Sequence, residues 1–230
     1  MITIHLAYTT IFLLAVIGPV ASWGILAFTK GMEIGDVSVI ATIGGTWGAF
    51  TAALGFVFLG ELITHMQIFD ICIIIGGTAL VSFNAKDAFR KGAAIGKGIE
   101  YGIMAALSFG IYFFLVAILT QDIGWIAATV LTGIPISLSL LAYLKYKKIE
   151  IRVNKKEIPL LLVTGLLGLG GIIFYNLGVT FNYADVVAPI SGASPLVTML
   201  IAFFLFGDSL RRSQKIGILM VVIGLALLSI

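Results

Sequence analysis

The chain has 230 residues, of which 60% are apolar and 11% are charged, and its formal net charge is +3. Soluble domains carry about 25% charged residues, so the composition excludes a soluble globular protein and gives no indication of nucleic-acid binding. The single cysteine, Cys72, excludes an intrachain disulfide, and no His or Cys cluster has metal-ligand spacing, so we expect no metal or other cofactor.

Eight apolar segments follow one another along the chain, and each approaches the roughly 20 residues that a helix needs to cross a bilayer. They cover residues 6–28, 37–59, 66–84, 99–120, 123–144, 158–178, 186–206 and 214–230. The first has no Lys or Arg ahead of it and runs past a signal-sized core, so we interpret it as a retained span. The segments lack a two-residue alternation, which favours helices over strands. The sequence therefore predicts an all-α multi-spanning membrane protein with about eight transmembrane helices in contact with the lipid bilayer.

All 14 Lys and Arg residues fall in alternate loops. The loops after the first, third, fifth and seventh segments hold every one of them, and the other loops hold none. Cations in short loops mark the cytoplasmic side of a membrane. We therefore expect a plasma-membrane protein whose odd-numbered loops are cytoplasmic and whose two termini lie outside.

The sequence contains an internal repeat. A shift of 147 residues aligns residues 13–83 with residues 160–230 without a gap, and about 20 of the 71 aligned positions are identical. The matches include several glycines and the pair Gln67 and Gln214, which shared apolar composition alone does not explain. The chain therefore contains a duplicated unit.

The two copies are expected to cross the membrane in opposite directions, because an odd number of spans separates equivalent segments. Such an inverted repeat is typical of carriers that work by alternating access, with the ligand site near the bilayer midplane. We assign residues 1–84 to a first copy of three spans and residues 99–230 to a second copy of five spans. Residues 99–147, which hold two helices, have no counterpart in the first copy, so the repeat is incomplete (3 + 5).

The motifs of both copies resemble a known family. The second copy has Ser194-Pro195-Leu196-Val197-Thr198, Gly207-Asp208, Gln214, Gly217 and Gly224, and the first has Gly60-Glu61, Gln67 and Gly77. In this order and duplication they are similar to the EamA-type transporters of the drug/metabolite transporter superfamily. The resemblance implies a carrier or exporter of small metabolites, usually built from ten spans as two inverted five-helix units, with termini on the cytoplasmic side. Here Trp47-Gly48 replaces the Ser-Pro of the second copy, and two helices of the first copy are lacking.

The missing helix pair leaves two explanations open: a longer natural chain, or a second subunit that supplies the pair. In either case we expect the first three spans to have uncovered faces, which include Thr9, Thr10 and Ser22.

Polar and aromatic residues inside the spans are the candidate substrate-binding residues. Asn176 and its neighbour Tyr175 lie deep in the sixth span, where an amide needs partners because an unpaired polar group in hydrocarbon costs several kcal/mol. Pro195 frees a backbone carbonyl and is a candidate helix kink. The other candidates are Thr46, Trp47 and Thr51 in the second span, Ser108 and Tyr112 in the fourth, and Ser194 and Thr198 in the seventh. For each of them, helix packing is the alternative interpretation.

The span centres carry no Asp, Glu, Lys or Arg, and Asp70 is expected near the outer ends, where water reaches it. The substrate should therefore be a small uncharged or zwitterionic molecule, for example of amino-acid type. No catalytic dyad is visible inside the membrane, so we do not expect an enzyme. The alternative function is a non-transporting membrane scaffold, or an incomplete carrier subunit that requires a partner. The sequence leaves formation of a homo-oligomer open.

Overall fold

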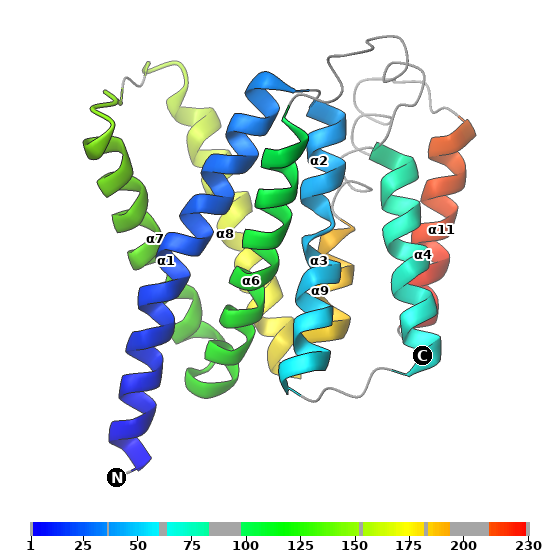
Figure 1. The fold of residues 1–230 in the computed structure, drawn as a ribbon, viewed down its shortest axis with the longest axis horizontal. Coiled ribbons are helices and arrows are strands. Elements are labelled where there is room, and N and C mark those ends of the chain that lie inside the picture. The colour runs from blue at the N-terminus through cyan, green and yellow to red at the C-terminus, as the bar shows by residue number, and fades with distance from the viewer. Residues whose placement is uncertain are drawn as a thin grey trace. The chain divides into compact units, whose positions relative to one another are not determined.

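The computed structural model describes residues 2–35, 37–59, 64–82, 98–151, 154–181, 184–193 and 212–228. Within these ranges every regular element is helical, which confirms the all-α prediction (Figure 1). The elements are α1 (Ile2–Ile34), α2 (Val37–Gly45), α3 (Trp47–Leu54), a π-helical turn η1 (Gly55–Leu59), α4 (His65–Ser82), α6 (Ile99–Ile123), α7 (Trp125–Tyr146), α8 (Ile158–Phe181), α9 (Ala184–Gly192) and α11 (Arg212–Leu228).

The long helices coincide with predicted spans. Among the described residues, four stretches are long and apolar enough to cross a membrane: Tyr8–Ile34, Ile99–Ile123, Trp125–Tyr146 and Ile158–Phe181. The second and third predicted spans correspond to the shorter apolar helices Ile43–Leu59 and His65–Leu80, and the seventh and eighth include α9 and α11. The chain is thus a multi-spanning membrane protein, but its second span is interrupted at Thr46 and ends in a π-helical turn.

The chain forms two compact units, each with parts of both predicted repeats. The first unit comprises residues 1–22 and 115–182, and the second comprises residues 23–114 and 183–230. We describe each unit by itself.

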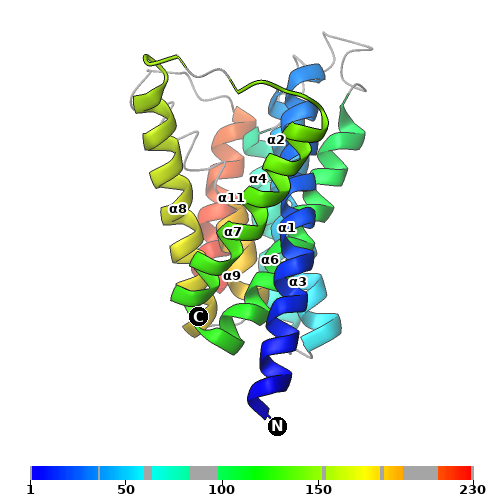
Figure 2. The same ribbon diagram turned by 90° about the vertical axis from the view of Figure 1, so that its left-hand side faces the viewer.

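In the first unit, α7 packs against α8 and also against the N-terminal part of α1 (Figure 2). Gly18 lets α1 approach α7 closely, since a Cβ at this position would lie 2.7 Å from the carbonyl oxygen of Pro135. Ser22 Oγ donates a hydrogen bond of 3.2 Å to the carbonyl oxygen of Ile136. The prediction that Ser22 lies on an uncovered face is therefore wrong: it is 4% exposed, because α7 of the second copy covers this side of α1.

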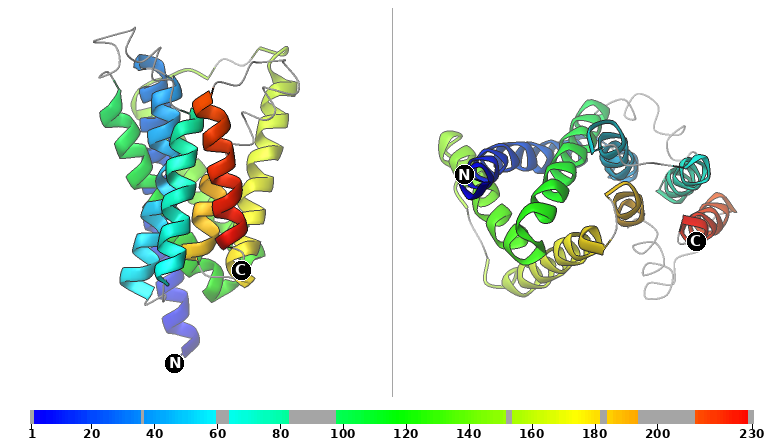
Figure 3. Two further views of the ribbon diagram at one scale, coloured as in Figure 1. Left: turned by 90° about the vertical axis from the view of Figure 1, so that its right-hand side faces the viewer. Right: turned by 90° about the horizontal axis from the view of Figure 1, so that it is seen from below.

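In the second unit, α4 and α11 lie side by side in both views of Figure 3. A Cβ added to Gly77 would lie within 3 Å of Gly217, Met220 and Val221. Because small residues let helix backbones approach, this glycine is required by the packing.

On α11, Gly224 also allows close packing, here against α4. A Cβ added to Gly224 would meet Asp70, Ile73 and Ile74. These three residues and Gly224 stand 147 positions from Gly217, Met220, Val221 and Gly77, respectively. The two helices are thus antiparallel. The contacts that Gly77 of α4 makes with α11 are repeated, at equivalent positions, by the contacts that Gly224 of α11 makes with α4.

The helix ends follow the same offset. Ile34 and Phe181, which end α1 and α8, are 147 residues apart. The same offset separates the start of α2 from the start of α9, and their ends at Gly45 and Gly192. It also separates the start of α4 from the start of α11. The offset that aligns the two copies in sequence also aligns their secondary structure.

Candidate functional site

The interruption of the second span at Thr46 has a counterpart at the end of α9 in the other copy. Both the backbone N–H and the Oγ1 hydroxyl of Thr46 donate to the carbonyl oxygen of Ile43, at 3.1 and 2.7 Å. At the equivalent position, where α9 ends, the N–H of Ala193 donates to the carbonyl oxygen of Ile190 at 3.2 Å. Each N–H bonds three residues back instead of four, which tightens the turn and ends the regular α-helix.

The second span and α9 cross each other at glycines. A Cβ at Gly48 would lie 2.5 Å from the carbonyl oxygen of Ala188, and a Cβ at Gly192 would lie 3.3 Å from that of Gly45. Gly45 and Gly192 are themselves equivalent in the repeat. Within the second unit, a pseudo-two-fold axis that relates these helices therefore lies close to this contact, since only residues near such an axis touch their own equivalents.

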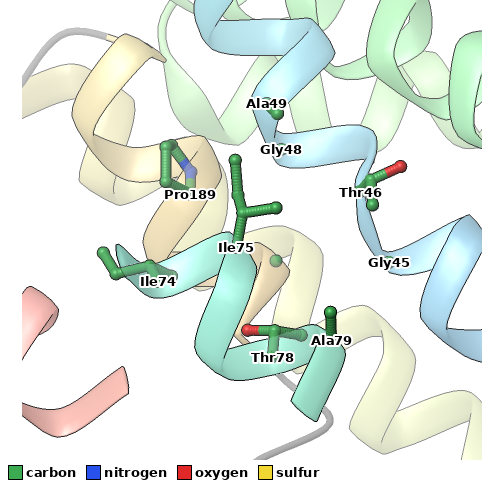
Figure 4. Close-up of a pocket in the computed structure, with 10 residues that line it drawn as sticks. Gly45, Thr46, Gly48, Ala49, Ile74, Ile75, Thr78, Ala79 and Pro189 are labelled. Atoms are coloured by element: carbon green, nitrogen blue, oxygen red, sulfur yellow. The ribbon is translucent and has the colours of Figure 1, made fainter. Parts of the chain in front are cut away.

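A small cavity adjoins the crossing, between α2, α3, α4 and α9 (Figure 4). Its lining residues are Gly45, Thr46, Gly48, Ala49, Ile74, Ile75, Thr78, Ala79, Pro189 and Gly192. Its volume of ≈ 20 Å³ admits about one water molecule, whereas small-molecule pockets have roughly 300 Å³ or more. The Oγ1 of Thr78 is buried and has no hydrogen-bond partner among the described residues. In this conformation the crossing is closed to a metabolite.

Trp47 and Tyr112 are brought together by Phe113, a residue that the sequence did not single out. The rings of Trp47 and Phe113 stack with centroids 4.0 Å apart, and Tyr112 meets the Phe113 ring edge-on at 4.7 Å. Tyr112 is buried, while Trp47 and Ser108 are half-buried. These aromatic contacts fix the orientation of the Trp47 indole against α6.

Thr51 forms an interhelical contact. Its Oγ1 is fully buried and lies 3.0 Å from the carbonyl oxygen of Gly110 on α6 and 3.2 Å from that of Trp47 on its own helix. A single hydroxyl hydrogen is shared between these two acceptors. Thr51 thus links α3 to α6.

In the first unit, one of the two polar atoms of the Asn176 side chain has a hydrogen-bond partner among the described residues and the other has none. Its Nδ2 donates to Thr129 Oγ1 at 2.8 Å, and that hydroxyl donates in turn to the carbonyl oxygen of Trp125 at 2.7 Å. The side chain is 0% exposed, and its Oδ1 has no partner among the described residues. The Oγ1 of Thr120, which the sequence did not single out, is buried in the same unit and also unpartnered there. Tyr175, next to Asn176, is 3% exposed.

Three predicted residues, Ser194, Thr198 and the kink candidate Pro195, lie outside the described residues. Asp70 corrects another expectation: it is 3% exposed rather than accessible to water. Its helix, α4, is covered at this level by α11, where Gly224 approaches the Asp70 backbone. A buried carboxylate within an apolar helix is a candidate functional group by default.

Comparison with known proteins matches both the second copy and the whole fold. Residues 96–230 match the sequence profile of the EamA-like transporter family. The uncharacterized protein MJ1333.1 of Methanocaldococcus jannaschii is 27% identical over 132 residues, which are 57% of this chain and 96% of that protein. A solved structure titled "Crystal structure of protein" superimposes with a TM-score of 0.72 at 13% identity, over 95% of this chain and 75% of that one. This last likeness concerns the fold alone.

Proposed function

Because the chain belongs to the EamA-like transporter family, we propose that this membrane transporter carries a small uncharged or zwitterionic metabolite, of amino-acid type, across the plasma membrane. Transport would proceed by alternating access between the two inverted copies. The odd-numbered loops would be cytoplasmic and both termini would lie outside, as the positions of the 14 cations suggest.

The observation that carries this proposal is the tight turn that ends α2 at Thr46 and is repeated where α9 ends at Ala193, beside the contact between Gly45 and Gly192. Interrupted helices at the centre of inverted repeats are typical of transporters, which bind substrate near such interruptions and rock one copy against the other. Because the same N–H to carbonyl bond ends the helix at Thr46 and at Ala193, each copy would bend at the same place. The closed cavity beside the crossing is compatible with a state in which the pathway is shut at this point.

The buried polar groups suggest the substrate chemistry. The Oδ1 of Asn176, which no described residue bonds, is a hydrogen-bond acceptor, and the Thr120 hydroxyl is both donor and acceptor. An acceptor suits an ammonium or hydroxyl group, whereas a phosphorylated substrate would call for Lys or Arg. In the second unit, the half-buried Trp47 would be a candidate contact for an apolar or planar part of a substrate.

The test is uptake by the purified chain in proteoliposomes, with a panel of neutral amino acids, other zwitterions and sugar phosphates. We expect saturable uptake of at least one neutral or zwitterionic compound and none of the sugar phosphates. Uptake restricted to anions would contradict the proposed substrate class. A folded protein that carries no member of the panel would favour the alternative function, a scaffold or an incomplete carrier subunit.

A further inference from the structure

An apolar stripe along α7 ends in a cluster of cations. Five large apolar residues that are each more than half exposed recur every three or four positions, on one face of the helix: Ile126, Val130, Ile134, Leu138 and Leu141. Lys145, four residues after Leu141, continues this face in the last turn of α7. In a membrane the stripe contacts lipid chains, so Lys145 lies where the headgroups of those lipids begin.

The segment that joins α7 to α8 is strongly basic. Residues 145–157 hold six cations and two acids, which gives a net charge of +4. The cations are Lys145, Lys147, Lys148, Arg152, Lys155 and Lys156. The five lysines are all exposed, and the ion pair found among the described residues, Lys30 with Glu33, lies elsewhere. The charges of these lysines therefore face an anion from outside the chain.

The turn that ends α7 keeps two lysines side by side. The N–H of Ile149 donates to the carbonyl oxygen of Leu144 at 3.0 Å, and the N–H of Lys148 donates to that of Lys145 at 3.1 Å, which is a Schellman motif. Lys148 has a φ of 54°, in the left-handed region where glycine is the usual residue. A lysine here carries a conformational cost that glycine would avoid, but it adds a second ammonium group next to that of Lys147.

At the start of α8, the neighbouring acid is used by the backbone. Glu157 Oε2 accepts a hydrogen bond of 3.3 Å from the N–H of Asn154, and Asn154 Oδ1 accepts one of 3.2 Å from the N–H of Lys156. This exchange caps the helix. The Glu157 carboxylate thus stabilises the helix start, while the side chains of Lys155 and Lys156 remain exposed.

Apolar side chains stand among these cations. Tyr146, Ile149 and Ile151 are 81%, 51% and 65% exposed, and the Lys147 ammonium lies 5.8 Å from the centre of the Tyr146 ring. Tyrosine rings favour the headgroup level of a membrane, and isoleucines favour the boundary with the acyl chains. A soluble anion would contact the cations but leave these apolar side chains in water. The combination therefore favours a lipid surface as the partner.

From these features we propose that residues 145–157 bind anionic phospholipid headgroups, with the lysines as the phosphate contacts and the isoleucines at the boundary with the acyl chains. Basic segments next to a membrane span are attracted to the anionic cytoplasmic leaflet, which agrees with the sidedness proposed above. The site itself is independent of the substrate and of the transport cycle, so its test requires no transport measurement.

The test places a fluorescent reporter at each end of α7, in the full chain with Cys72→Ser. The chain is reconstituted in nanodiscs that mix phosphatidylcholine with phosphatidylglycerol, one of the two being brominated near the glycerol so that it quenches bimane. Bimane on Ile149→Cys reports on the basic segment. Bimane on Ile126→Cys is the matched control, because residues 99–144 contain no Lys or Arg. We expect the binding constant at Ile149 to favour phosphatidylglycerol about tenfold or more, and no such preference at Ile126.

Charge variants identify the lysines as the cause. Lys147→Gln combined with Lys148→Gln should reduce the preference at Ile149 to about a fifth or less. Arg212→Gln combined with Lys215→Gln removes the same charge from the exposed start of α11 and should leave the preference unchanged. Lys148→Gly suits the left-handed turn, so it should raise the thermal unfolding midpoint in phosphatidylcholine and still lower the preference.

Four results would overturn the proposal. They are equal quenching by both lipids at Ile149, the same preference at Ile126 as at Ile149, an equal loss in the two double variants, and an unchanged preference in Lys148→Gly. Displacement of the lipid by free phosphate, at an ionic strength at which chloride has no effect, would also contradict it and make a soluble anion the ligand.

Discussion

Gly192 lies against Gly45, the residue that occupies the same place in the other copy, with 3.3 Å between the position of a Gly192 Cβ and the Gly45 carbonyl oxygen. The α4–α11 pair shows the same symmetry, because Gly77 contacts α11 at positions equivalent to those at which Gly224 contacts α4. When equivalent residues of the two copies contact each other, the copies can exchange conformations and the same residues remain in contact. This is the physical basis of the transport cycle proposed above.

The α4–α11 contact should be sensitive to a single methyl group. Gly77→Ala places a Cβ 2.8 Å from the Gly217 carbonyl oxygen, and the backbone has to move. We expect a loss of about 1–3 kcal/mol in the free energy of unfolding, measured by thermal unfolding in mild detergent. Gly76→Ala is the matched control, because its nearest neighbour is the flexible Met220 Cε at 3.5 Å. Equal stabilities of the two variants would show that the glycine is not needed for close packing.

Thr51 should matter for stability more than for substrate binding. Thr51→Val keeps the side-chain volume but removes the bond to the Gly110 carbonyl oxygen, so we expect a loss of about 0.5–1.5 kcal/mol. Thr51→Ser keeps the hydroxyl and should recover most of that bond. Thermal unfolding and uptake should be measured together. A Val variant that is as stable as the natural chain but transports poorly would instead assign Thr51 to substrate contact.

Asn176 should matter for transport more than for stability. Asn176→Leu fills the same space without the free Oδ1 acceptor, so we expect uptake to fall about tenfold or more while the protein remains folded. Thr180→Val on the same helix removes an exposed hydroxyl that bonds the Asn176 backbone carbonyl, and should transport normally. Tyr112→Ala should reduce uptake more weakly. Normal uptake by Asn176→Leu would leave the amide as a packing contact with Thr129.

The cation distribution makes a separate prediction about sidedness. In a Cys72→Ser background, Thr64→Cys should react with a membrane-impermeant maleimide added to intact cells, and Lys91→Cys should react only after permeabilisation. Both expectations follow from the retention of cationic loops in the cytoplasm. The reverse pattern would invert the topology, and equal labelling would indicate insertion in both orientations.

The long helices and their repeat could be predicted from sequence because apolar runs and glycine register are local properties. The interruption at Thr46 could not, since Thr46 sits in an apolar run and a threonine hydroxyl also bonds a carbonyl three or four residues back in an uninterrupted helix. The burial of Ser22 and Asp70 was missed for a related reason: helices distant in sequence, α7 and α11, cover them. Among the candidate site residues, Asn176 was recognised by the cost of burying an amide, whereas Thr120 and Phe113 carry no signal until their surroundings are known.

The central claim is alternating access by the two copies, and counterflow tests it most directly. Proteoliposomes preloaded with an unlabelled substrate from the uptake panel are diluted into a trace of the same labelled compound. A carrier that exposes one site to each side in turn should accumulate the label transiently above its equilibrium level, at a rate that rises with the internal concentration. Label that enters no faster into preloaded than into empty vesicles would contradict alternating access, even if the chain conducts the compound.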